Sequence, residues 1–232
     1  MLYIIKMDTN NFYYITISTK PHPILQKLIQ KVQQNGEHIE VLGEEENRVI
    51  GWENQQRFGI KLREVADYLK RSHLNPNDII LFTDAYDIAY FGRKNEIIER
   101  YLKFSYPIVF GCENECHPDP QKSVLYTKKD VEFPFLNSGM FIGRVYALQK
   151  CIENYKYNDT DDDQRWWTTQ YLENPDLITL DYENTMFLNT SGFHRHYFMF
   201  DIENSLAIYK NNNPLFIHVN GPDKSFIREL YN

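Results

Sequence analysis

The chain has 232 residues and a formal net charge of −7 at pH 7, and 42% of its residues are apolar. This length and composition predict a packed globular protein of one α/β domain, or at most two small ones, rather than a disordered chain. The negative charge leaves no broad basic surface, so nucleic acid is not expected as a partner. No run approaches 18 apolar residues, and the opening segment is too short for a signal peptide, so a soluble chain without membrane contact is expected.

The first half of the chain alternates between strand and helix patterns. β-branched and aromatic residues predict a strand at 12–18, and apolar residues at helical spacing predict a helix over 24–32. A short strand at 38–43 and a helix over 60–71 follow. The unbroken apolar run at 79–84 is typical of a strand that a parallel sheet buries on both faces.

The second half continues this alternation and then breaks into shorter strand patterns. The expected elements are a helix at 95–103, strands at 107–113 and 135–143, a helix at 146–157, and short strands at 177–181, 206–209 and 215–221. Strands that alternate with helices predict a doubly wound α/β fold, with a mostly parallel central sheet, flanking helices and added C-terminal strands. Such sheets bind ligands at the carboxyl ends of their strands. Because no linker is evident, we expect a single domain over 1–232.

Acidic residues stand at one of these strand ends. Asp84 and Asp87 come at the end of the strand at 79–84, and His218 ends a second apolar strand near the C-terminus. Carboxylates bind magnesium, manganese or calcium, and an imidazole among them favours manganese over magnesium. Taken singly, Asp84 is better explained as a turn cap, Asp87 as a solvated acid and His218 as a hydrogen-bonded core histidine. Together at strand ends, the three favour a metal site. Neither glycine-rich nucleotide motif, G-x-G-x-x-G or G-x-x-x-x-G-K-[ST], occurs.

A second acidic cluster lies in the segment NDTDDDQRWW. It follows the last expected helix, and acids beside a helix C-terminus are disfavoured by the helix dipole. A calcium-binding loop is excluded because Gln164 and Gln170 stand where that loop needs Gly and Glu. The segment therefore indicates acid/base or cation-stabilising chemistry beside an apolar wall of Trp166 and Trp167, and a solvated charge run is the alternative. Its acids are Asp159, Asp161, Asp162 and Asp163.

Seven segments, in this order, resemble the glycosyltransferase domain of the multifunctional procollagen lysyl hydroxylases, a family that includes giant-virus relatives. They are ITIST, LFTDAYDI, VFGCENECHPDP, FPFLNSGMFIG, DDDQRWWT, LDYENTMFLN and PLFIHVNGPDK. The resemblance runs over nearly the whole chain and implies a GT-A fold, an α/β sheet that binds a nucleotide sugar and manganese. Since no downstream H-x-D iron motif is present, we expect no hydroxylase domain in this chain.

The resemblance also implies roles for residues that contact the metal and the nucleotide. Asp84, Asp87 and His218 match the metal ligands of the family. Tyr86 matches the aromatic residue that stacks on uracil, and Thr19 matches a nucleotide contact.

The resemblance also assigns residues to the diphosphate and the sugar of the donor. Those at the diphosphate are Asn220, Gly221 and Lys224. Those on the sugar side are Asn137, Ser138 and Gly139, and those at the reaction centre are Asp161, Asp162 and Asp163. The resemblance gives catalytic roles to Asn137 and to the three acids. The chain departs from the family at His117, where Trp is frequent, and at Val219, where Gly follows the histidine.

The activity that the resemblance implies is hexosyl transfer. In this family a manganese-dependent enzyme moves glucose from UDP-glucose to galactosyl-hydroxylysine of collagen-like chains, with retention of configuration. The alternatives are transfer of galactose from UDP-galactose to hydroxylysine, transfer to another glycan, and a silent sugar-nucleotide-binding module. Relatives imply a homodimer. A glycan on the sequon at Asn158 would lie against the acids, which favours synthesis outside the secretory route, in a host cytoplasm or a virion if the chain is viral.

Overall fold

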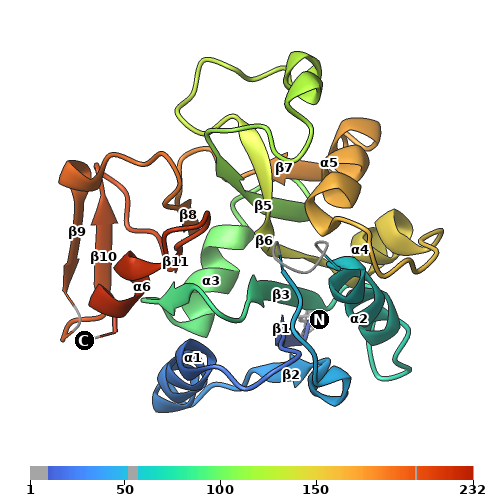
Figure 1. The fold of residues 1–232 in the computed structure, drawn as a ribbon, viewed down its shortest axis with the longest axis horizontal. Coiled ribbons are helices and arrows are strands. Elements are labelled where there is room, and N and C mark those ends of the chain that lie inside the picture. The colour runs from blue at the N-terminus through green and yellow to red at the C-terminus, as the bar shows by residue number, and fades with distance from the viewer. Residues whose placement is uncertain (1–9, 52–56, 202, 232) are drawn as a thin grey trace, which may run out of the picture.

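A six-stranded sheet forms the centre of the computed structural model, which describes residues 10–51, 57–201 and 203–231 (Figure 1). Its strands, in the spatial order β2-β1-β3-β6-β5-β7, are β1 (Phe12–Ile17), β2 (Glu40–Leu42), β3 (Ile79–Asp84), β5 (Ile108–Glu113), β6 (Phe135–Arg144) and β7 (Ile178–Leu180). β1 pairs in parallel with β2 and β3, and β5 pairs in parallel with β7. Only β6 runs antiparallel to its neighbours within this sheet. The predicted mostly parallel α/β sheet is confirmed.

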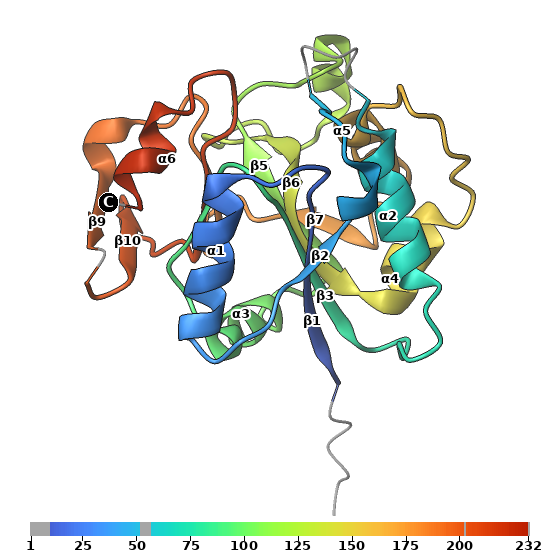
Figure 2. The ribbon, with the colours of Figure 1, turned by 60° about the horizontal axis from the view of Figure 1, so that its bottom comes forward.

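Helices cover both faces of this sheet. The α-helices of the described residues are α1 (Pro23–Gln34), α2 (Gly59–Leu69), α3 (Lys94–Tyr101), α4 (Val145–Ile152), α5 (Asp163–Glu173) and α6 (Ser225–Glu229), of which α6 lies beside the C-terminal strands, and 3₁₀ helices occur at Glu44–Glu46, Pro120–Leu125 and Arg195–Tyr197. Figure 2 shows α1 and α3 against one face and α2, α4 and α5 against the other. Alternate residues of β3 point to opposite faces of the sheet, where they join two hydrophobic cores. Ile80 and Phe82 pack with α2 and α4, while Ile79 and Leu81 pack with α1 and α3.

A second, three-stranded sheet lies beside the first. It contains β4 (Ile88–Tyr90), β11 (Phe216–His218) and β8 (Phe187–Asn189), in that order. β11 runs antiparallel to β4 and parallel to β8, and this register sets His218 opposite both Ile88 and Asn189. Of this sheet, only β11 is among the added strands that the sequence predicts, and it carries His218 to the end of β3, whereas β8 was not expected.

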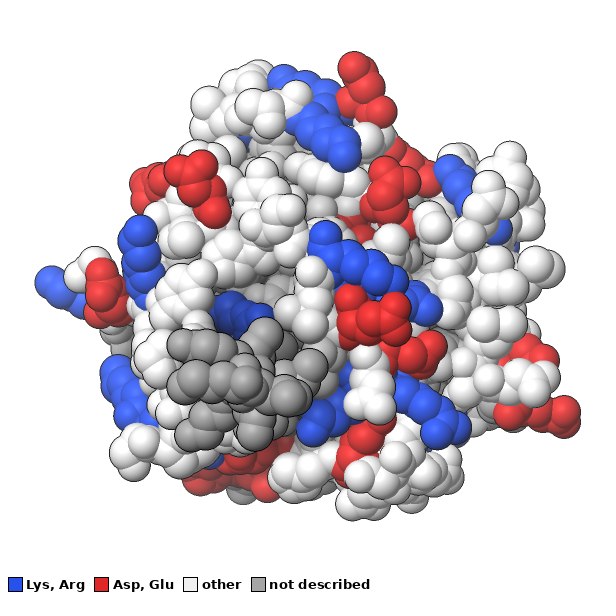
Figure 3. Space-filling view, turned by 180° about the vertical axis from the view of Figure 1, so that it is seen from behind, with Lys and Arg blue, Asp and Glu red and all other residues white. Residues whose placement is uncertain are grey.

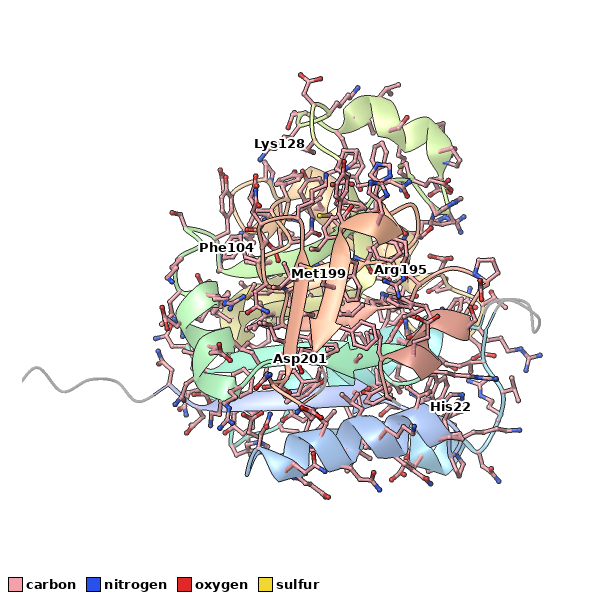
Figure 4. All side chains as sticks on the ribbon, turned by 90° about the vertical axis from the view of Figure 1, so that its left-hand side faces the viewer. His22, Phe104, Lys128, Arg195, Met199 and Asp201 are labelled. Atoms are coloured by element: carbon pink, nitrogen blue, oxygen red, sulfur yellow. The ribbon has the colours of Figure 1, made fainter. Side chains whose placement is uncertain are left out.

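A hairpin of β9 (Phe198–Asp201) and β10 (Leu206–Tyr209) completes the C-terminal part. Figure 4 views it from its outer side, where Met199 is 62% exposed. Arg195 attaches the hairpin to α6, because its guanidinium lies 4.4 Å from the ring centre of Phe226 and 3.0 Å from a carboxylate oxygen of Glu229.

The region around the acidic segment corrects the sequence interpretation. The helix expected at 146–157 ends at Ile152, and the unexpected helix α5 begins at Asp163. The acids therefore precede a helix instead of following one. Asp162 caps α5, since its side chain accepts a hydrogen bond from the Arg165 amide at 2.9 Å. Acids are favoured at a helix N-terminus, where the amides are free and the dipole is positive.

The surface carries charges of both signs. Figure 3 shows one face, on which acidic and basic side chains are interspersed rather than separated into fields of one sign. The loop between β5 and β6, seen at the top of Figure 1, bears the exposed apolar side chains Val124 and Leu125. Among the described residues, no helix has the length and apolar character needed to cross a membrane.

Candidate active site

The acid pair and the histidine meet where the two sheets join. Asp84 ends β3, Asp87 directly precedes β4, and His218 ends β11. The Val219 amide donates to the Asp87 carbonyl at 2.9 Å, which ties the end of β11 to the loop after β3. One ligand atom from each of the three side chains lies within 4.8 Å of the others. The residues predicted to share a metal are therefore together.

The donor set of this cluster suits a divalent cation. His218 Nε2 lies 3.3 Å from Asp87 Oδ2 and 3.8 Å from Asp84 Oδ2. Asp84 Oδ1 is buried against Lys61 Nζ at 2.6 Å, so Asp84 Oδ2 is the oxygen that faces His218. Asp87 is only 9% exposed, which excludes the alternative of a solvated acid. Two carboxylates and one imidazole fit manganese, and these three residues would hold it.

The surroundings shift the pKa values of Asp84 and Asp87 in opposite directions. Burial would raise the pKa of Asp87, but His218 and Lys224 outweigh burial and hold this pKa well below its usual range. Burial raises the pKa of Asp84, Lys61 opposes that rise, and the charge of Asp87 adds to it. Two close acids with pKa values pushed apart are typical of a functional site.

Gly139 leaves the space in which these side chains meet. A Cβ on Gly139 would lie 2.3 Å from His218 Cε1 and 3.0 Å from Asp84 Oδ2. No side chain fits there without displacing a predicted ligand. The neighbouring Asn137 shapes this backbone, because its Oδ1 accepts a hydrogen bond from the Gly139 amide at 2.9 Å.

Lys61 links the acid pair to the acidic segment. Its Nζ lies 2.6 Å from Asp84 Oδ1 and 3.0 Å from Asp163 Oδ2. Ser138 Oγ donates to the same oxygen of Asp163 at 2.9 Å. Asp163 therefore belongs to the site. Sequence reasoning missed Lys61, because a lysine in the first turn of an amphipathic helix gives no signal of its own.

The other acids of the segment are placed differently. Asp162 is buried as the cap of α5, and burial, followed by the charge of Asp163, raises its pKa. Asp161 is half-buried in the turn before the helix. Trp167 packs in the core against Phe110 and Phe141, at centroid distances of 5.2 and 5.3 Å. The expected apolar wall at the site was thus wrong for this tryptophan, whose position in α5 points it at the sheet.

A buried acid that the sequence interpretation passed over, Glu113, ends β5 at the same edge. Gln164 Nε2 donates to one of its carboxylate oxygens at 2.6 Å, and Asn220 Nδ2 donates to the other at 2.8 Å. Gln164 Oε1 in turn accepts from the Ser138 amide at 3.2 Å. Burial raises the pKa of Glu113. The strand-end rule that selected Asp84 could have found this residue as well.

The segment after β11 places the ammonium group of Lys224 beside Asp87. Lys224 Nζ donates to Asp87 Oδ2 at 2.5 Å and to the Val219 carbonyl at 2.6 Å. Gly221 has a φ of +82°, a left-handed conformation that favours glycine and lets the chain turn back here. Asn220 Oδ1 accepts a hydrogen bond from the Ser191 amide at 2.7 Å. The three predicted diphosphate contacts therefore follow closely on His218, and Lys224 reaches Asp87.

Tyr86 is fixed against the loop after β1. Its hydroxyl accepts hydrogen bonds from the amides of Thr19 and Lys20, at 3.0 and 3.2 Å. The ring of His22 packs on the Tyr86 ring with centroids 4.7 Å apart and an interplanar angle of 37°. Tyr86 and Thr19, the two expected nucleotide contacts, thus lie together, and His22 is an aromatic neighbour that sequence reasoning missed.

The sequence of this chain is similar to sequences of procollagen lysine hydroxylases. Residues 8–232 match the family model described as the PLOD GT domain. A multifunctional procollagen lysine hydroxylase and glycosyltransferase of Caenorhabditis elegans is 28% identical over 97% of this chain and 32% of its own length. The human multifunctional procollagen lysine hydroxylase and glycosyltransferase LH3 is 29% identical over 73% of this chain and 23% of its own length. The chain thus spans about a third or less of these relatives.

A solved structure shares the fold. The glycosyltransferase involved in the glycosylation of the major capsid of PBCV-1 aligns with a TM-score of 0.50 at 14% identity, covering 94% of this chain and 98% of its own. This likeness concerns the fold, and with the mostly parallel sheet it confirms the expected GT-A type α/β fold. Because the family model covers nearly the whole sequence, the chain belongs to the PLOD GT domain family of glycosyltransferase domains.

Proposed function

We propose that this domain transfers a hexose from a UDP-sugar to a hydroxylysine-bearing, collagen-like acceptor. The observation that carries the proposal is the meeting of Asp84, Asp87 and His218 at the end of β3, in a chain of the PLOD GT domain family. The names of the relatives, procollagen lysine hydroxylase and glycosyltransferase, support the acceptor class. Residues 1–232 would act as a single domain.

Manganese is the proposed metal, because an imidazole among the ligands favours it over magnesium. When bound, a divalent cation supplies charge that stabilises the diphosphate as it departs from the sugar. Lys224 adds a second positive charge beside Asp87, where it can pair with a phosphate oxygen. Gly221 and Asn220 would bring backbone and amide groups to the same diphosphate.

The uracil end of the donor would lie at the loop after β1. Tyr86 presents an aromatic ring there, and its hydroxyl is held by the Thr19 amide. Base–aromatic stacking contributes about 1–3 kcal/mol per base, so a ring fixed before binding supports nucleotide affinity. The packing of His22 on the Tyr86 ring keeps that ring in place.

The acidic segment would border the reacting sugar. Asp163 is the acid best supported for this role, because it shares Lys61 with Asp84 and accepts a hydrogen bond from Ser138. Its negative charge can offset positive charge that develops on the sugar. Asp162 supports this arrangement as the cap of α5, and Asp161 lies one residue further from the helix. Asn137 would act by shaping the backbone of Gly139.

The specific reaction we propose is transfer of glucose from UDP-glucose to galactosyl-hydroxylysine with retention of configuration, as the family resemblance implies. The test incubates the protein with manganese and either UDP-glucose or UDP-galactose, and with a peptide bearing galactosyl-hydroxylysine or hydroxylysine. The mass of each peptide is then measured. A gain of one hexose only with UDP-glucose and the galactosylated peptide is expected. A gain on free hydroxylysine from UDP-galactose would replace the proposed substrates, and no gain in any pairing would favour a silent binding module.

A further inference from the structure

A buried asparagine stands behind the histidine of the site. Asn189 ends β8 and is 0% exposed, and the parallel register of β8 with β11 sets it opposite His218. Asn189 Oδ1 lies 2.7 Å from Nδ1 of the His218 ring. The Thr190 amide also donates to the His218 carbonyl at 3.0 Å, so the two strand ends are held together by backbone as well.

The orientation of the Asn189 amide follows from its second partner. Its Nδ2 donates to the Cys112 carbonyl of β5 at 2.9 Å. A carbonyl oxygen can only accept hydrogen bonds, so the NH₂ group must face Cys112 and the oxygen must face His218. An amide oxygen that faces Nδ1 can only accept a hydrogen bond from it. Nδ1 of His218 therefore carries a proton whether the ring is neutral or charged.

The proton on Nδ1 determines whether Nε2 can act as a metal ligand. In the neutral ring only one nitrogen holds a proton, so Nε2 keeps its lone pair. Nε2 is the nitrogen that faces the acids, at 3.3 Å from Asp87 Oδ2 and 3.8 Å from Asp84 Oδ2. In water a neutral histidine favours the opposite tautomer, with its proton on Nε2, which cannot bind a metal through that atom.

We propose that Asn189 is a positioning residue for the metal: it holds the His218 ring with the proton on Nδ1 and the lone pair of Nε2 toward Asp84 and Asp87. This inference rests on the metal site of the proposed function. Partners of this kind behind a metal-bound histidine fix its tautomer and ring orientation, and their loss lowers metal affinity by about 10–100-fold. Here the partner is a neutral amide, anchored by a backbone carbonyl from the other sheet.

The tautomer is measured directly, in the wild-type protein. A long-range ¹H–¹⁵N spectrum of the metal-free protein, recorded where the ring is neutral, reports which nitrogen of His218 is protonated. The His218→Ala variant assigns the signal among the seven histidines. Protonation at Nδ1 is expected in the wild type, with a shift of population toward Nε2 in Asn189→Leu. A wild-type ring protonated at Nε2 would overturn the proposal even if the variant failed to fold.

The link to the metal is tested by a double-mutant cycle. Metal-free protein is titrated with Mn²⁺ alone, and the free ion is followed by electron paramagnetic resonance. Asn189→Leu should weaken Mn²⁺ binding about 10–100-fold, but change it less than about twofold when His218→Ala is already present. Asn35→Leu, which also removes an amide-to-carbonyl bond, to Gly92 at 3.0 Å, is the control and should leave Mn²⁺ affinity unchanged.

The outcomes separate this proposal from the proposed function. An equal loss in both backgrounds would show a merely structural role for Asn189 and overturn the inference. If the wild type transfers no hexose and binds no Mn²⁺, the proposed function fails, whereas the tautomer in the spectrum still stands or falls on its own. If the enzyme is active and His218 is protonated at Nε2, only the role of Asn189 is lost.

Discussion

At the scale of single residues, charge in the site depends on contacts that no local pattern records. Burial would lower the pKa of Lys61, but Asp163 and Asp84 outweigh burial and raise it well above its usual value. The ammonium is therefore charged and holds two acids at once. Asp84 and His218 could be predicted because each ends an apolar strand, and Asp87 because it follows Asp84 by three residues. Lys61 and Asn189 could not, because only tertiary packing brings them to the site.

The acids of the segment before α5 should differ in importance. Asp163→Asn keeps the size of the side chain but removes the charge that faces Lys61, so turnover should fall by about 10²-fold, roughly 3 kcal/mol of transition-state stabilisation. Asp162→Asn should leave turnover within about twofold, because asparagine caps a helix as well as aspartate does. Steady-state kinetics of both variants check this. Equal losses in the two would contradict the assignment of the charge effect to Asp163.

A methyl group at Gly139 should damage the metal site. Gly139→Ala sets a carbon 2.3 Å from His218 Cε1, so the ring must shift and Mn²⁺ affinity should fall about tenfold or more. Gly36→Ala is the control: nothing lies within 4 Å of its new carbon, but its φ of +71° makes alanine unfavourable by about 1–2 kcal/mol. The control should lower the free energy of unfolding without changing Mn²⁺ affinity. Normal Mn²⁺ binding by Gly139→Ala would argue against the crowding of these ligands.

At the scale of elements, the helices and strands that can be predicted are those with a regular pattern of apolar residues in the sequence. The strand β3 and the helices α1 and α2 follow from apolar runs and helical spacing. Helix α5 does not, because its buried residues include few apolar ones, and tryptophan and threonine are modest helix formers. The antiparallel direction of β6 is also hidden, since a strand buried on both faces reads the same in either direction.

An ion pair joins two segments beside the site. Arg48 binds both carboxylate oxygens of Asp159, at 2.5 and 2.7 Å. Both side chains are partly exposed, so Arg48→Ala should lower the free energy of unfolding by at most about 1 kcal/mol at pH 7. Lys70→Ala, which breaks an exposed pair with Asp67, is the control and should cost close to nothing.

The cost of Arg48→Ala should depend on pH. The hydrogen bond from Arg48 holds the pKa of Asp159 below its usual range. A carboxyl whose folded pKa is depressed stabilises the fold above its unfolded pKa of about 3.9, and that contribution is lost as the pH falls through the lower, folded pKa. Urea unfolding at pH 7 and at about pH 3 checks this. A cost that grows as the pH falls below 3.9 would have the wrong sign for this ion pair.

At the scale of the whole molecule, the site joins two sheets. Asp84 comes from the six-stranded sheet and His218 from the three-stranded sheet, with Asp87 in the loop between β3 and β4. A cation that binds all three would connect both sheets and would bind the folded chain more tightly than the unfolded one. Metal binding should therefore stabilise the entire fold, although the sequence alone shows only that two strand ends carry ligands.

Thermal unfolding reports this connection. Mn²⁺ at about 100 times its dissociation constant should stabilise the wild type by about 2.7 kcal/mol, which raises Tm by roughly 5 to 11 °C for a domain of this size. Asp87→Ala should abolish the shift, because it removes a ligand from the loop that joins the sheets. An unchanged shift in Asp87→Ala would mean that Mn²⁺ binds elsewhere on the chain.

The central claim is that one metal centre, formed by Asp84, Asp87 and His218, supports hexosyl transfer. Its most direct test is the mass of a galactosyl-hydroxylysine peptide after incubation with UDP-glucose and Mn²⁺. We predict a gain of one hexose with the wild type. No gain is expected when EDTA is in excess, or with an Asp87→Ala variant whose circular dichroism spectrum shows that it is folded. Full transfer in excess EDTA, or by Asp87→Ala, would contradict the claim.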